Sequence, residues 1–176
     1  MTESNLLVDA IERATKEVFE TMLGAELLLE DPSRFTTNAG VVSLVGLTGN
    51  WSGTGTLSCT PESARLMASR FLMMDVDTLS PSIDSDVLDA VAELTNMVVG
   101  NIKNLLSEHL GEMAISIPTV IYGRNFHFKS FAGMSQGAVV FSWETHAFQV
   151  KIGLAPTFEP TSAIRQRLSS PAFSAT

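Results

Sequence analysis

Apolar residues recur every three or four positions in three segments of the chain, and this spacing predicts three amphipathic helices. The predicted helices span residues 5–23, 61–74 and 86–110. Thr60 and Pro61 give the second helix an N-cap and a first-turn proline. Gly24 and Gly111 follow the first and third helices, where a glycine commonly ends the helical pattern.

Segments rich in β-branched and alternating apolar residues lie between and after these helices and predict strands. The short apolar run is at residues 26–30, and the predicted longer strands are at residues 40–47, 53–60, 114–122, 137–144 and 147–154. Residues 48–52 have the composition of a hairpin connection. Residues 75–85 form a connector rich in Asp, Ser and Pro, and residues 156–176 carry no strong period.

The same order of elements occurs twice: a helix, a short strand, and two longer strands joined by a turn. Residues 36–57 and 126–148 also share a Gly-bounded pair of strands. We therefore predict an α+β fold of two similar halves, residues 5–75 and 84–155. The halves form one mostly antiparallel sheet with long helices packed on one side. Residues 1–155 then make one domain, and residues 156–176 make a loosely structured C-terminal tail.

Composition narrows the class of protein. The chain has 176 residues, of which 45% are hydrophobic, and its 19 acidic against 11 basic residues give a net charge of -8. An apolar fraction of this size excludes whole-chain disorder. The absence of a Lys/Arg cluster argues against nucleic-acid binding. No apolar stretch approaches the ~18 residues needed to span a membrane, and the first residues lack a basic signal-peptide region. We expect a cytoplasmic protein.

Several chemical motifs are better explained as ordinary structure. Residues 133–137 spell G-x-S-x-G around Ser135, but strand formers follow where a nucleophile elbow needs a helix. The glycines at 49, 53 and 55 suit a hairpin with positive φ angles rather than a phosphate cradle. Three histidines, at 109, 127 and 146, lack metal-ligand spacing. The single cysteine, Cys59, excludes an intrachain disulfide and a Cys-based zinc site.

The long helix at residues 86–110 carries the most informative pattern. At ~100° per residue its apolar residues fall on one broad arc, and a separate arc carries a polar stripe. The polar stripe consists of Asp89, Glu93, Asn96, Gly100, Asn104 and Ser107. Met97 lies beside it, off the apolar arc. A carboxylate and a carboxamide thus stand one turn apart, without the Glu-to-Lys pairing of an ordinary solvated face. A solvated face remains the simpler interpretation of composition alone.

The run Asp89-x3-Glu93-x2-Asn96, continued by Met97 and Gly100, resembles the signature helix of the CheX/CheC family of chemotaxis phosphatases. In that family a proline follows some two dozen residues later, and here 21 residues separate Asn96 from Pro118. The wider resemblance covers about residues 5–154, including the duplicated architecture.

The resemblance implies a phosphatase that hydrolyses the aspartyl phosphate of a CheY-like response regulator, with Mg²⁺ supplied by the regulator. It implies that Asn96 orients the attacking water and that Glu93 contacts a lysine of the regulator. Asp89, Met97, Gly100 and Pro118 would support or contact the partner. Orienting water with an amide is the device that GTPases use with a glutamine.

The resemblance also distinguishes between family types. CheC-type members carry the motif in both halves, but the first helix here has Thr15 where asparagine is needed, which favours a CheX-like protein with one active site. CheX-like members commonly dimerise through their sheets, so a homodimer is expected. Two other functions stay open: a non-catalytic regulator-binding or flagellar-switch-like assembly module on the same scaffold, and, least favoured, a small-molecule hydrolase using Ser135.

Overall fold

The computed structural model describes residues 3–35, 39–124 and 133–157. Its helices are α1 (Glu3–Leu23), η1 (Pro32–Arg34, a 3-10 turn), α2 (Pro61–Phe71) and α3 (Ser85–Leu110). Its strands are β1 (Leu28–Glu30), β2 (Ala39–Gly49), β3 (Trp51–Cys59), β4 (Met113–Ile115), β5 (Thr119–Arg124), β6 (Ser135–Trp143) and β7 (His146–Pro156). The predicted tail and His127 fall largely or wholly outside these ranges.

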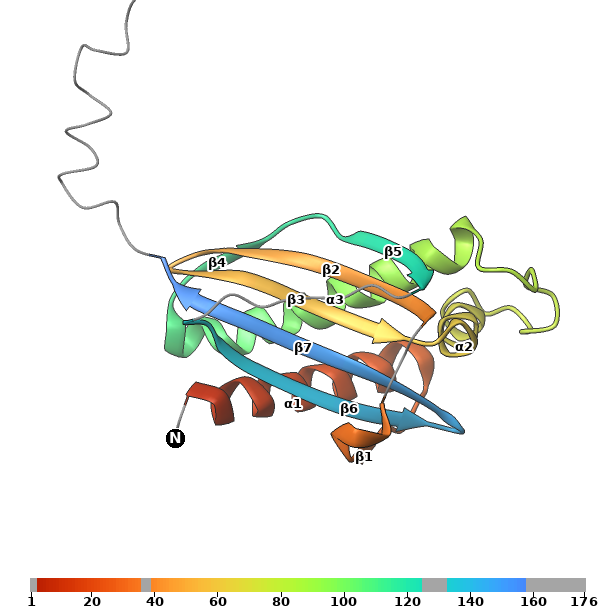
Figure 1. Ribbon diagram of the computed structural model, residues 1–176, viewed down its shortest axis with the longest axis horizontal. Helices are drawn as coiled ribbons and strands as arrows, with labels where there is room; N and C mark the ends of the chain where they lie inside the picture. Colours follow the sequence, from red (N-terminus) through yellow and green to blue (C-terminus); the bar gives the residue numbers. More distant parts are fainter. Residues whose placement is uncertain (1–2, 36–38, 125–132, 158–176) are drawn as a thin grey trace, which may run out of the picture.

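The strands form one seven-stranded sheet in the order β1-β6-β7-β3-β2-β4, with β5 also pairing with β2. Every strand pairing in the described residues is antiparallel. The centre is β3 against β7, and each half sends its short strands to the other half: β1 pairs with β6, while β4 and β5 pair with β2. The long helices α1 and α3 cover one face (Figure 1), which confirms the predicted fold class.

Two glycines of the sheet set how closely the long helices approach it. A Cβ on Gly55 in β3 would lie 2.6 Å from Cγ2 of Val99 in α3. A Cβ on Gly137 in β6 would lie 2.8 Å from Cβ of Leu7 in α1. Both distances are shorter than real Cβ contacts, so each helix rests on a position that admits no side chain.

Local chemistry fixes the helix boundaries. The side chain of Thr60 accepts a hydrogen bond from the Ser63 N–H at the start of α2, as its sequence predicts. Gly111 ends α3 with a φ of 81°, a conformation that costs glycine little. The prediction that α2 reaches Met74 is wrong: the helix ends at Phe71, and Met73 takes a φ of 54°, which stops helical propagation.

The strand predicted over residues 114–122 is interrupted. Leu47 pairs with Ile115, but Leu44 pairs with Thr119, so three steps along β2 match four steps along the partner strand. One extra residue makes this a β-bulge, and it separates β4 from β5. The bulge contains Pro118, which has no N–H to donate to the sheet.

The hairpin glycines also differ from expectation. Gly49 alone of the three has a positive φ, at 148°. Gly53 is required for another reason, because a Cβ there would lie 1.9 Å from the carbonyl oxygen of Gly153 in the neighbouring strand. Gly55 is required by the approach of α3. Close tertiary contact, not turn geometry, accounts for two of the three.

Candidate functional site

The polar stripe of α3 lies on the surface, as its period predicts. Asp84 caps the helix by accepting a hydrogen bond from the Val87 N–H at 3.1 Å, which sets where the helix begins. Val91 and Val98, on the other side of the helix, are fully buried, so the polar stripe faces solvent. Asp89 and Glu93 are exposed, and Asn96 is half-buried.

The carboxylates and the first amide of the stripe have no partner in the described part of the chain. Within the described residues, the side chains of Asp89, Glu93 and Asn96 make no hydrogen bond or ion pair. By contrast, Ser107 farther along the stripe donates to the carbonyl oxygen of Lys103 at 2.7 Å. A carboxylate and an amide one helical turn apart are therefore free to bind an external group.

Strands β4 and β5 flank this helix. Gly111, at the end of α3, sits against Asn50 of the β2–β3 hairpin, and β4 pairs with the hairpin end of β2, so β4 and β5 run back alongside α3. Cδ1 of Ile115 would lie 3.7 Å from a Cβ on Gly100, which is ordinary contact distance. Packing against the described residues therefore does not require a glycine at position 100.

Pro118 lies at the level of the carboxylate and amide. Three residues of extended chain from Ile115 to Pro118 span about 10 Å. Seven residues of helix from Gly100 back to Glu93 also span about 10 Å. Because β4 and β5 run antiparallel to α3, going back along the helix from Gly100 and forward along the strand from Ile115 leads in the same direction. These matching lengths bring the bulge alongside the turn that holds Glu93 and Asn96.

The burial of Met97 differs from what the helical period predicts. The helical period places it off the apolar arc, but its half-buried side chain packs against the hydrophobic core. The reason is that neighbouring elements cover α3 more widely than one face. Met97 therefore helps seat the helix, and any contact with a partner would use its exposed remainder.

The first helix offers a direct comparison, because its buried positions repeat those of α3. Adding 80 to seven buried positions of α1, from Leu7 to Phe19, gives seven buried positions of α3, from Val87 to Val99. Thr15 is fully buried and occupies the position that corresponds to Thr95. The alignment of Thr15 with Asn96, made from the sequence, is therefore wrong.

The α1 positions that match Asp89, Glu93 and Asn96 carry Asp9, Arg13 and Lys16. Arg13 pairs with Asp9 at 3.6 Å, and Lys16 pairs with Glu12 at 2.7 Å. This face of α1 is a solvated surface with helical ion pairs. Its cations stand where α3 has a free carboxylate and a free amide, so the two faces differ in charge.

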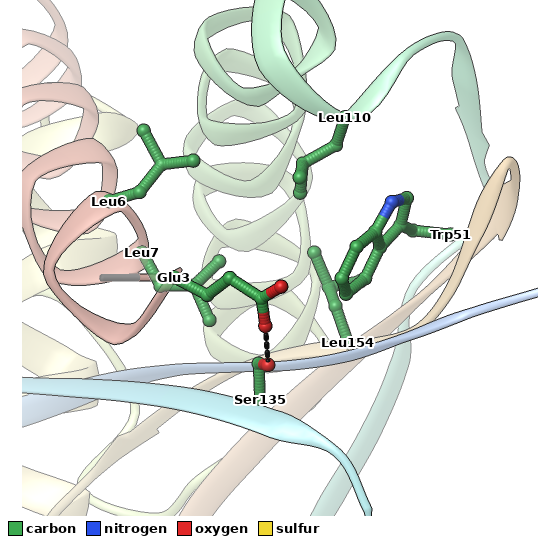
Figure 2. A pocket seen from close by; sticks show the side chains of 7 residues that line it. All are labelled: Glu3, Leu6, Leu7, Trp51, Leu110, Ser135 and Leu154. Carbon is green, nitrogen blue, oxygen red and sulfur yellow. Dashed lines mark hydrogen bonds between the residues drawn. The ribbon is translucent and has the colours of Figure 1, made fainter. Parts of the chain in front are cut away.

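The alternative nucleophiles lack a catalytic setting. Ser135 begins β6 and donates a hydrogen bond to the carboxylate of Glu3, beside a narrow, mostly apolar crevice (Figure 2). It leads into a strand, as predicted, and not into a helix. Cys59 is fully buried, and burial raises the pKa of its thiol to about 12, which keeps it protonated and unreactive.

Among the described residues, no group of three His, Cys, Asp or Glu side chains is placed to hold a metal ion. In the same part of the chain, no helix is both long and apolar enough to cross a membrane.

Sequence reasoning missed the role of Ser116 in the bulge. The hydroxyl of Ser116 accepts a hydrogen bond from the Gly46 N–H at 2.9 Å and donates to the carbonyl oxygen of Ile117 at 2.8 Å. Together these bonds hold the bulge. The available signal was Pro118 inside an otherwise regular strand pattern, which favours a bulge or an edge strand.

Comparison with known proteins identifies the family of the chain. The family model described as "Chemotaxis phosphatase CheX" matches residues 41–144. The CheY-P phosphatase CheX of Thermotoga maritima is 32% identical over 130 residues, which cover 71% of this chain and 81% of that protein.

Solved structures share the fold. Chemotaxis protein CheX from Vibrio vulnificus superposes with a TM-score of 0.72 at 22% identity, covering 84% of this chain and 95% of that chain. A chain of the CheX–CheY–BeF3–Mg²⁺ complex from Borrelia burgdorferi superposes with a TM-score of 0.68 at 24% identity, covering 84% of this chain and 97% of that chain. The matched family model and the identity to the Thermotoga protein lead to one conclusion: the chain belongs to the CheX family of chemotaxis phosphatases.

Proposed function

We propose that this protein is a phosphatase that hydrolyses the aspartyl phosphate of a CheY-like response regulator. The observation that carries the proposal is the polar stripe of α3, where Glu93 and Asn96 have no side-chain partner among the residues that the structure describes. The family, and the name of the Thermotoga relative as a CheY-P phosphatase, support the substrate class. The CheX–CheY complex supports the kind of partner.

Asn96 is the residue we assign to the water. Its amide oxygen accepts a hydrogen bond from a water molecule and holds it in line with the phosphorus atom. The water oxygen then forms a bond to phosphorus, the bond from phosphorus to the regulator's aspartate breaks, and the aspartate leaves as a carboxylate. An amide is not a base, so the proton passes to a phosphate oxygen or to solvent. Such a reaction depends mainly on positioning and on charge stabilisation.

Glu93 is assigned to the partner's lysine. One turn from Asn96 and exposed, its carboxylate can form an ion pair with a lysine beside the phosphoryl group. Asp89, one further turn away, extends the acidic surface toward the same partner. Any Mg²⁺ would be supplied by the regulator, where it would neutralise charge on the phosphoryl oxygens.

Gly100 supports a site that a partner enters closely. Glycine in a helix interior costs about 0.5–1 kcal/mol relative to alanine, and the packing of this chain does not require it. The missing side chain leaves room for the partner next to Asn96. Met97 and Pro118 would border that contact from either side.

We further propose a cytoplasmic homodimer formed through the sheets. The outermost strand β1 pairs with β6, and it presents Leu28 and Leu29 with 64% and 52% of their surface exposed. An apolar edge strand of this kind is suited to pairing with a second copy.

Loss of phosphoryl label from a phosphorylated regulator tests the activity. We expect the wild-type protein to accelerate the loss, and Asn96→Ala to lower the accelerated rate about 100-fold, because the water is no longer positioned. Asn104→Ala is the matched control: it removes an exposed amide from the same helix, two turns away. If Asn96→Ala acts as fast as the wild type, the assignment is wrong. Binding of the regulator without acceleration would instead identify a non-catalytic interaction module.

A further inference from the structure

A largely exposed apolar side chain projects from the bulge beside the polar stripe. Ile117 is 87% exposed, far more than its neighbours Ile115 and Val120, which both pack against the core. The segment that carries it bows away from β2 at the edge of the sheet (Figure 1). Exposing a large aliphatic side chain forgoes about 1.5–3 kcal/mol of burial.

The bulge presents this side chain rigidly. The N–H of Ser116 donates to the carbonyl oxygen of Gly46 at 2.9 Å, and its hydroxyl bonds both to the Gly46 N–H and to the carbonyl oxygen of Ile117. Pro118 fixes the backbone on the other side of Ile117. Three hydrogen bonds and a proline thus restrict the conformations of an exposed residue, so ordering it on binding costs little entropy.

The chemistry of the bulge argues against a second copy as the occupant. Pairing of two sheet edges needs a regular row of backbone donors and acceptors. Here Pro118 lacks an N–H, the carbonyl oxygen of Ile117 is already bonded to Ser116, and the register slips by one residue. Bulges and prolines are devices that prevent strand addition, so a partner would have to be contacted through side chains.

We infer that Ile117, held in place beside Pro118, forms an apolar contact for the receiver domain of the response regulator, adjacent to the polar stripe. The inference rests on the proposed function, because it extends the surface on which Glu93 and Asn96 act. The length of helix from Gly100 back to Glu93 and the length of strand from Ile115 to Pro118 are both about 10 Å, so the bulge and the two polar side chains lie at the same level. A partner that reaches Asn96 over Gly100 meets Ile117 at the rim, where an apolar anchor contributes affinity and the polar groups contribute chemistry.

Steady-state hydrolysis of a phosphorylated regulator tests this contact with Ile117→Ser. We expect the KM to rise about tenfold with kcat unchanged, since the side chain binds the partner but does not touch the reacting atoms. The matched control is Met73→Ser, which removes an apolar side chain that is 94% exposed after α2. Ser116→Ala should raise KM less, and Ser116→Thr, which keeps the hydroxyl, should restore it. A KM within twofold of the wild type for Ile117→Ser would overturn the inference.

Two further measurements separate this inference from the proposed function. The Kd for a beryllofluoride-loaded regulator should also rise about tenfold in Ile117→Ser, whether or not the protein turns over substrate. Absence of wild-type turnover would therefore refute the phosphatase proposal and leave the contact to be decided by this Kd. Sedimentation should show the same oligomeric state for both proteins; a variant that dissociates would mean that a second copy covers Ile117, which contradicts the inference.

Discussion

Replacing Gly55 with alanine would place a methyl group where α3 rests on the sheet. That Cβ would lie 2.6 Å and 3.0 Å from the two γ carbons of Val99, and 2.9 Å from Cδ1 of Ile152. Valine in a helix has one strongly preferred rotamer, so Val99 cannot readily turn aside. The helix itself has to move, and Val99 lies on the stretch between Asn96 and Gly100.

The size of the effect follows from these distances. Ordinary Cβ contacts begin near 3.4 Å, so the methyl group requires about 0.8 Å more than the 2.6 Å available. Overpacking of this kind costs about 1–3 kcal/mol, and the reduced entropy of the unfolded chain returns about 0.4–1 kcal/mol. We expect a net loss of about 1–2 kcal/mol in the free energy of unfolding. Misplacement of a catalytic group by about 1 Å lowers activity up to ~100-fold.

Gly137→Ala provides the matched control, because it disturbs α1 and leaves α3 in place. Its Cβ would lie 2.8 Å from Cβ of Leu7. Urea unfolding should show comparable destabilisation for both variants, while kcat falls at least tenfold for Gly55→Ala and stays within twofold for Gly137→Ala. Val99→Ala should partly relieve the overpacking caused by Gly55→Ala. The double variant should then have a higher free energy of unfolding than the sum of the two single effects predicts. Equal kcat losses in both glycine variants, or strict additivity, would refute the reasoning.

Two other predictions concern single residues. Thr15→Val should raise the free energy of unfolding by about 1 kcal/mol in thermal denaturation, because the buried Thr15 hydroxyl has no hydrogen-bond partner among the described residues. Thr95→Val should give no such gain, since the Thr95 hydroxyl donates to the carbonyl oxygen of Val91 at 2.7 Å. Gly100→Ala should stabilise the fold by about 0.5–1 kcal/mol and weaken regulator binding. An unchanged Kd in Gly100→Ala would show that the partner does not approach there.

The sequence predicted what depends on short-range periodicity. Helical spacing identified the three α-helices of the described residues, and the phase of α3 identified Asp89 and Glu93 as exposed. Features that depend on distant segments were missed. The break at Pro118 involves a register slip against β2, some seventy residues earlier, and alternation within one segment cannot show it. The requirement for Gly55 comes from the approach of α3, and the burial of Met97 comes from elements outside its helix.

The two long helices show how one scaffold separates folding from chemistry. Their buried positions agree at an offset of 80, and each helix rests on a glycine of the sheet, so the same physical requirements are met twice. The exposed arcs share an aspartate, Asp9 or Asp89, but then differ, with Arg13 and Lys16 on α1 where α3 has Glu93 and Asn96. Ion pairs occupy the first arc, whereas Glu93 and Asn96 on the second arc have no partner within residues 3–35, 39–124 and 133–157. A duplicated core tolerates this divergence because exposed substitutions cost little stability. A partner can therefore be recognised by one half while both halves support the sheet.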